Sequence, residues 1–108
     1  MVSSAAVKVM MVGDLILDEP QPDSFFEFAR STLEEADVLI GHVEVPHTRR
    51  GHEATFDIPA PPGNPDHLAA LKRAGFHVAT LAGNHIFDAG PAGIVEWRVG
   101  SLFVTDVG

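Results

Sequence analysis

Three short apolar segments, each followed by polar residues, constrain the fold more than any other feature of this sequence. They cover residues 6–12 (AVKVMMV), 37–45 (DVLIGHVEV) and 76–82 (FHVATLA). Each segment has the length of a β-strand and is short for a buried helix. We therefore expect three strands, the first of them apolar enough to be buried on both faces, as strands of a parallel sheet are.

The segments between these strands have the features of helices. Residues 24–36 carry apolar side chains at helical spacing, which predicts an amphipathic helix. Asn64 predicts the N-cap of a second helix, with Pro65 in its first turn and Gly75 at its C-terminal end. The side chains expected to pack against the sheet are Phe25, Leu33, Leu68 and Leu71. The order β-α-β-α-β predicts an α/β fold with a mostly parallel sheet flanked by helices.

The pattern is weaker after residue 90. Residues 91–98 are compatible with a third helix and residues 102–107 with a last strand. The chain of 108 residues has the length of one small domain, and 45% of its residues are hydrophobic. A domain of this size buries a limited share of its surface. We therefore expect marginal stability and an unpaired sheet edge, which makes self-association possible.

Charge and composition exclude several classes of protein. Seven Lys and Arg residues against fifteen Asp and Glu residues give a net charge of −8, which argues against a nucleic-acid partner. The absence of Cys excludes a disulfide scaffold, thiolate zinc sites and thiol catalysis, and it leaves the redox compartment undecided. Because no apolar run approaches the ~20 residues of a membrane span, we expect a soluble chain without a transmembrane segment.

Polar residues gather at the carboxyl ends of the three predicted strands. They are Asp14, then His42 and Glu44, then Asn84, His85 and Asp88. Ligands of open parallel sheets bind at this end of the strands, so we expect Asp14, Glu44 and Asn84 to lie on one rim. Carboxylate, amide and imidazole donors suit Mn, Fe, Zn or Mg.

Each of these residues also has a structural interpretation. Asp14 is compatible with a turn, Glu44 with a structural ion pair, and Asn84 with a turn before a helix-capping His85. Glu44 is the hardest to explain in this way, because a buried carboxylate needs a partner or a metal. His42 stays open between a metal ligand, a donor to a ligand and an ordinary strand residue. His47 lies close enough in sequence to the rim to contact an anion.

Several motifs together resemble one known family. They are Val12-Gly-Asp14, the segment 42–48 (HVEVPHT), Pro61-Pro62 and the segment 71–90 (LKRAGFHVATLAGNHIFDAG). Through them the chain resembles the CapA-type capsule synthesis (poly-gamma-glutamate biosynthesis) family, within the calcineurin-like metallophosphatase superfamily. The resemblance extends over about residues 7–95. It implies that residues 1–108 form the amino-terminal half of a larger metallophosphatase-like domain.

The resemblance also implies roles for individual residues. Asp14, Glu44 and Asn84 resemble ligands of a dinuclear divalent-metal site. His85 resembles the histidine that contacts the scissile phosphate and protonates the leaving group, and Asp88 would tune its pKa if the carboxylate lies within reach. The implied activity is metal-assisted hydrolysis of a phosphoester or a related bond.

The sequence departs from the family pattern in ways that affect this function. His42 stands where the family usually has Asn, and Ile16 where the superfamily has a metal-binding His. The later His motifs of the superfamily are absent from these residues, so we expect an incomplete metal site. The alternative function is a non-catalytic binding or assembly component that holds an anionic polymer or a partner protein. The expected location is cytoplasmic or, by analogy with the family, at the cell envelope.

Overall fold

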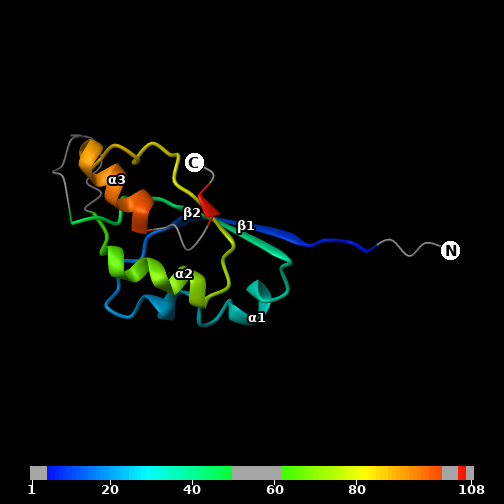
Figure 1. The fold of residues 1–108 in the computed structure, drawn as a ribbon. Helices are drawn as coiled ribbons and strands as arrows, with labels where there is room; N and C mark the ends of the chain where they lie inside the picture. Colours follow the sequence, from blue (N-terminus) through cyan, green and yellow to red (C-terminus); the bar gives the residue numbers. More distant parts are fainter. Residues whose placement is uncertain (1–4, 50–61, 101–104, 107–108) are drawn as a thin grey trace.

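Parallel strands form a single sheet in this protein. The computed structural model describes residues 5–49, 62–100 and 105–106. The strands are β1 (Val9–Leu15), β2 (Val38–Val43), β3 (Val78–Thr80) and the two-residue β4 (Thr105–Asp106), and they lie side by side in that order (Figure 1). All three neighbouring pairs are parallel, as the sequence predicts.

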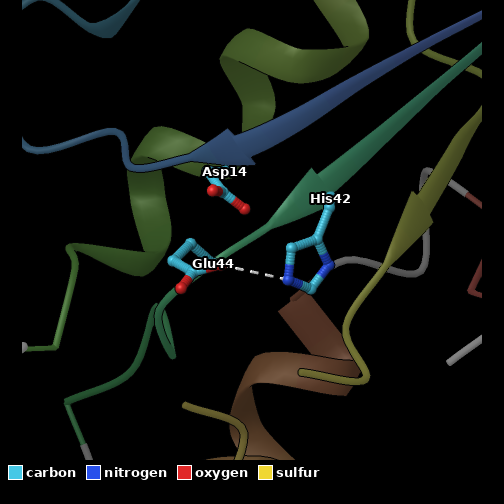
Figure 2. A group of neighbouring side chains, drawn as sticks. All are labelled: Asp14, His42 and Glu44. Atoms are coloured by element: carbon cyan, nitrogen blue, oxygen red, sulfur yellow. Dashed lines mark ion pairs between the residues drawn. The ribbon is translucent and has the colours of Figure 1, made fainter. Parts of the chain in front are cut away.

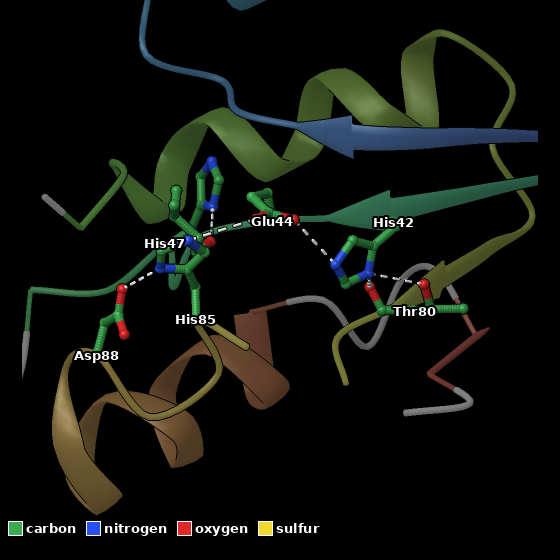
Figure 3. A network of polar contacts seen from close by, with 7 residues as sticks. His42, Glu44, His47, Thr80, His85 and Asp88 are labelled. Atoms are coloured by element: carbon green, nitrogen blue, oxygen red, sulfur yellow. Dashed lines mark hydrogen bonds and ion pairs between the residues drawn. The ribbon is translucent and has the colours of Figure 1, made fainter. Parts of the chain in front are cut away.

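Short helices connect the strands. They are the 3-10 helices η1 (Pro22–Phe26) and η2 (Pro65–Leu68) and the α-helices α1 (Arg30–Leu33), α2 (Ala69–Arg73) and α3 (Gly90–Gly100). Helix α2 contacts η1, and α3 contacts η2, the element that leads into α2. Figures 1 and 3 show these helices beside the sheet. The predicted α/β class with flanking helices is therefore confirmed. None of the described helices is long and apolar enough to cross a lipid bilayer.

The core lies on the face of the sheet that packs against η1 and α2. Leu39 and Val43 of β2 point into it and are fully buried, whereas the alternate residue His42 lies on the opposite, partly open face. Leu33, Leu68 and Leu71 are buried in this core, as predicted, and Trp97 of α3 completes it.

The first strand differs from its prediction. β1 is an edge strand, and only one of its faces is covered. Met10 and Val12 pack against the core, whereas Val9 is 54% exposed and Met11 is 74% exposed. The expectation of burial on both faces is therefore wrong. The apolar run in the sequence indicates a strand. How much of that strand is buried depends on which elements pack against it in the sheet.

The helix predicted over residues 24–36 is also wrong as a single element. The segment divides into η1 and α1. Successive side chains of a 3-10 helix point in directions about 120° apart, so two adjacent Phe residues do not both face the core. Phe26 enters the core, where its ring centroid lies 5.4 Å from that of Phe76. Phe25 is 44% exposed, contrary to the prediction that it packs against the sheet.

The second helical segment begins and ends at the predicted residues. The side chain of Asn64 accepts a hydrogen bond of 3.0 Å from the backbone N–H of Asp66, and Pro65 opens η2. Gly75 follows α2 with a φ of 93°, the left-handed conformation that glycine adopts without strain. β4 falls within the predicted last strand, whose residues 102–104 and 107 lie outside the described residues.

Candidate metal centre

An irregularity at the end of β1 positions Asp14. Val12 and Leu15 both pack against the core and both pair with β2, yet three steps along β1 match two steps along β2. In a regular strand Asp14 would share the face of Val12 and point its carboxylate into the apolar core. The extra residue prevents this, and Asp14 takes the left-handed conformation with a φ of 53°. Such bulges re-aim side chains near functional sites.

Three side chains meet at this end of the sheet. His42 and Glu44 are two residues apart along β2 and its continuation, so they share a face of the sheet. Asp14, His42 and Glu44 each offer one ligand atom that lies within 4.8 Å of the other two (Figure 2). The structure thus places His42 within the cluster, a role that the sequence left open. Its spacing of two residues from Glu44 is the signal that favoured this placement.

The imidazole of His42 is positioned by hydrogen bonds to Thr80 of β3. Its Nδ1 lies 3.1 Å from the backbone carbonyl oxygen of Thr80 and 3.0 Å from the Thr80 hydroxyl (Figure 3). A carbonyl oxygen only accepts hydrogen bonds, so Nδ1 carries the proton in this contact. In neutral His42 the other nitrogen, Nε2, then presents a lone pair to the Glu44 carboxylate, whose Oε2 is 3.2 Å away.

A second histidine approaches Glu44 from the segment after β3. Nε2 of His85 lies 3.5 Å from Oε1 of Glu44, and its Nδ1 lies 2.6 Å from Oδ2 of Asp88 (Figure 3). His85 and Asp88 are both buried, at 9% and 4% exposure. Asp88 therefore lies within reach of His85, as the function predicted for it requires. Glu44 thus has one imidazole Nε2 beside each of its two oxygens.

Two predicted site residues lie apart from this cluster. Asn84 is exposed, and within the described ranges it forms no hydrogen bond or ion pair with the cluster. Its role as a ligand stays a prediction. His47 is fully buried, with Nδ1 2.8 Å from the Val45 carbonyl oxygen and the edge of its ring against Gly63. Burial lowers the pKa of His47, and this effect outweighs the opposing hydrogen bond to Val45.

The segment that follows Glu44 is fastened to α3. Glu96 accepts hydrogen bonds from the Thr48 hydroxyl and from the backbone N–H of Arg49, the latter at 2.7 Å. The Arg49 guanidinium in turn contacts Asp66 at 2.7 Å. These contacts fix the backbone on the C-terminal side of Glu44, while the pairing of β2 fixes the other side.

The fold and the cluster together define an α/β protein with imidazole and carboxylate groups at the carboxyl ends of parallel strands. The sequence matches the family of bacterial capsule synthesis proteins, PGA_cap, over residues 8–98. The chain belongs to this family, which confirms the CapA-type resemblance. No curated protein matches the chain at the threshold applied.

Proposed function

We propose that Asp14, His42 and Glu44 hold a divalent metal ion and that this site hydrolyses a phosphoester or a related bond. The contact between His42 and Glu44 carries the proposal. A lone pair facing a carboxylate oxygen at 3.2 Å is favourable only when a cation is shared between them or when His42 is itself protonated. The Thr80 carbonyl keeps the Nδ1 proton in place, and Nε2 is the atom left for a metal.

The donor set fits a transition metal. Bonds from Zn²⁺ to imidazole nitrogen and carboxylate oxygen measure about 2.0–2.2 Å, so donors to one ion lie within about 4.4 Å of one another. The three side chains here lie within 4.8 Å, a spacing that a small side-chain rotation closes. One imidazole with two carboxylates suits Mn, Fe or Zn, and the site has no sulfur ligand that would favour copper.

A metal bound here would supply Lewis-acid polarisation of a phosphoryl oxygen and a water of lowered pKa. The protein's own groups supply proton transfer and orientation. Asp88 accepts from Nδ1 of His85, which leaves Nε2 of His85 directed toward Glu44 and the site. When both ring nitrogens of His85 carry protons, Nε2 is placed to give its proton to a leaving group. The carboxylates alone would repel an anionic substrate, so the site needs the cation for binding as well as for chemistry.

The first experiment measures metal binding. Calorimetric titration with Mn²⁺ and Zn²⁺ is expected to show binding to the wild-type chain. Glu44→Gln and His42→Ala are each expected to lower the affinity by at least about tenfold, since each removes a ligand. Glu34→Gln removes an exposed carboxylate remote from the site and serves as the control, with unchanged affinity. If the wild-type chain binds neither ion, the proposed site is wrong.

The second experiment separates hydrolysis from binding alone. The chain is incubated with 4-nitrophenyl phosphate and bis(4-nitrophenyl) phosphate, with and without the metal that binds. Release of nitrophenolate that depends on metal and is lost in Glu44→Gln supports the hydrolase. If the chain binds metal but hydrolyses neither compound with any of the metals tested, the alternative function is favoured, a non-catalytic binding or assembly component.

A further inference from the structure

A groove opens beside the candidate metal centre and has no role in the chemistry above. It has a volume of about 410 Å³ and begins at Asp14, at the end of β1. Its lining combines two carboxylates with apolar side chains: Asp14, Leu15, Ile16, Leu17, Asp18 and Phe25. Since Asp14 belongs to both the cluster and the groove, the groove adjoins the proposed metal position and offers room for part of a molecule bound there.

Two apolar residues of the lining, Ile16 and Phe25, are not part of the buried core. Ile16 is 40% exposed and Phe25 is 44% exposed, whereas their chain neighbours Leu17 and Phe26 are 1% and 4% exposed. The core therefore buries Leu17 and Phe26, whereas Ile16 and Phe25 keep exposed surface at the groove. Isolated exposed apolar residues are ordinary, but two that line one groove next to a polar cluster are typical of a ligand subsite.

The charge of the groove is negative. Asp14 and Asp18 are both exposed, and no Lys or Arg is among the lining residues. Asp18 forms no ion pair within the described part of the chain. When a metal neutralises Asp14, Asp18 still keeps its charge. An anionic group is therefore repelled from the groove, and a cationic group is attracted.

We propose that the groove binds the leaving group of the substrate, and that this group is a small organic cation: an ammonium on a short alkyl or aryl body. Phe25 and Ile16 contact the apolar body, Asp18 attracts the charge, and the Phe25 ring adds a cation–π contribution. The inference rests on the proposed function only for the position of the reacting phosphoryl group beside Asp14. The substrate class is thus a phosphoester of an amino alcohol or of a related cationic alcohol.

The test measures cation binding without metal, so that it is independent of hydrolysis. Amide chemical shifts of the ¹⁵N-labelled chain are followed during titration with benzyltrimethylammonium, benzyl alcohol and benzoate. We expect the cation to shift residues 14–18 and 25, with affinity about tenfold higher than that of benzoate and intermediate affinity for the neutral alcohol. Equal binding of the cation and benzoate, or shifts confined to other residues, would overturn the proposal.

Variants locate the site. Phe25→Ala and Asp18→Asn are each expected to weaken cation binding several-fold. Phe28→Ala is the matched control for Phe25, because Phe28 is 96% exposed and lies outside the groove lining, and Glu34→Gln is the control for charge. If Phe25→Ala unfolds, as a loss of chemical-shift dispersion would show, Phe25→Leu is used in its place. Leucine keeps most of the apolar volume and removes the aromatic ring. Unchanged affinity in Asp18→Asn contradicts the assignment.

The two proposals fail separately. Hydrolysis of the nitrophenyl esters without cation binding would overturn the groove and leave the metal centre intact. Cation binding without metal binding would overturn the metal centre and leave the groove as a cation site. If both hold, phosphocholine and phosphoethanolamine are expected to be hydrolysed faster than glycerol phosphate. Asp18→Asn is expected to remove that preference.

Discussion

Asp14 combines a strained backbone conformation with the side chain of a proposed metal ligand. Among the described residues it is the one non-glycine residue with a positive φ, at 53°. Its neighbour Gly13 does not adopt this conformation, although glycine would do so without strain. The left-handed conformation falls on the residue whose carboxylate must turn away from the core. A strained conformation persists only where the surrounding structure holds it, and here the bulged pairing of β1 with β2 surrounds it.

The strain predicts an unusual order of stabilities. Asp14→Gly is expected to be more stable than Asp14→Ala by about 1 kcal/mol, because alanine keeps the left-handed penalty and glycine does not. Urea unfolding measures both variants, and neither should bind Mn²⁺. At Asp18, whose φ is not positive, the order should reverse, with the alanine variant more stable. If the alanine variant were the more stable one at both positions, Asp14 would not be strained in solution.

His47 predicts a loss of stability in acid. Its folded-state pKa is lowered from 6.5, mainly by burial; nearby His67 also lowers it, while Val45 and Asp18 raise it. The unfolded chain therefore binds a proton more readily than the folded chain. The contribution of neutral His47 is complete above about pH 6.5 and is lost as the pH falls toward the folded pKa.

The comparison variant for this pH dependence is His47→Gln. As the pH falls from about 7.5 to about 5.5, the wild type should lose more of its free energy of unfolding than the variant does. Urea denaturation at several pH values gives both curves. Parallel curves would mean that His47 does not titrate on unfolding and that another group causes the acid sensitivity.

At the scale of elements, the sequence predicts which segments are strands and helices better than how each is exposed. The parallel β-α-β-α-β order follows from apolar runs and from local signals such as Asn64 and Gly75. The position of β1 at the sheet edge depends on pairing between distant segments, which a local pattern does not contain. The split of residues 24–36 likewise depends on which of Phe25 and Phe26 meets Phe76.

The packing between β2 and its neighbours yields a prediction for two glycines. A Cβ on Gly41 would lie 2.6 Å from a Leu15 side-chain carbon and 2.7 Å from the Phe76 ring. Gly41→Ala is therefore expected to cost about 1–3 kcal/mol of unfolding free energy. Gly13→Ala is the control, because nothing lies within 4 Å of its added Cβ, and its effect should stay within about 0.5 kcal/mol. Chemical denaturation of both variants decides; equal effects would contradict the packing described.

At the scale of the whole molecule, the uncovered face of β1 is the feature most open to association. Val9 and Met11 of β1 are 54% and 74% exposed, and Val7, just before the strand, is 67% exposed. An exposed apolar edge strand is a template for pairing with another chain. The sequence predicts an unpaired edge without saying which strand forms it. Both β1 and β4 lie at edges of the sheet, and β1 is the edge strand with the exposed apolar residues.

Met11→Lys is expected to reduce concentration-dependent association without lowering stability, since a charge on an edge strand opposes pairing with another chain. Sedimentation velocity across a concentration series measures the association. Phe28→Lys introduces the same charge at a residue that is 96% exposed and lies outside the sheet, so it should leave association unchanged. Equal reductions in both variants would indicate that net charge, and not the β1 edge, controls association.

For the candidate site, too, the sequence pattern predicts which residues gather but not how each side chain is directed. The ends of the strands predict where Asp14, His42, Glu44 and His85 gather, because parallel strands bring their carboxyl ends to one edge. The direction of a loop side chain depends on local backbone geometry, and Asn84 accordingly lies exposed beside the cluster. The groove at Phe25 has no sequence signal, since the helical periodicity assigned this residue to the core.

At the end of β1, two residues of β1 lie opposite one residue of β2. The geometry of the proposed site therefore depends on the number of residues in β1 as well as on their identity. In-frame loss of the codon for Gly13 would leave every proposed metal ligand present and restore a regular ladder between Val12 and Leu15. Asp14 would then lie directly opposite His42 in an ordinary strand conformation, with its carboxylate in a different position relative to Glu44. A survey of substitutions alone would not detect this change, because the geometry of the proposed site would alter while its residues stayed the same and its sheet became more regular.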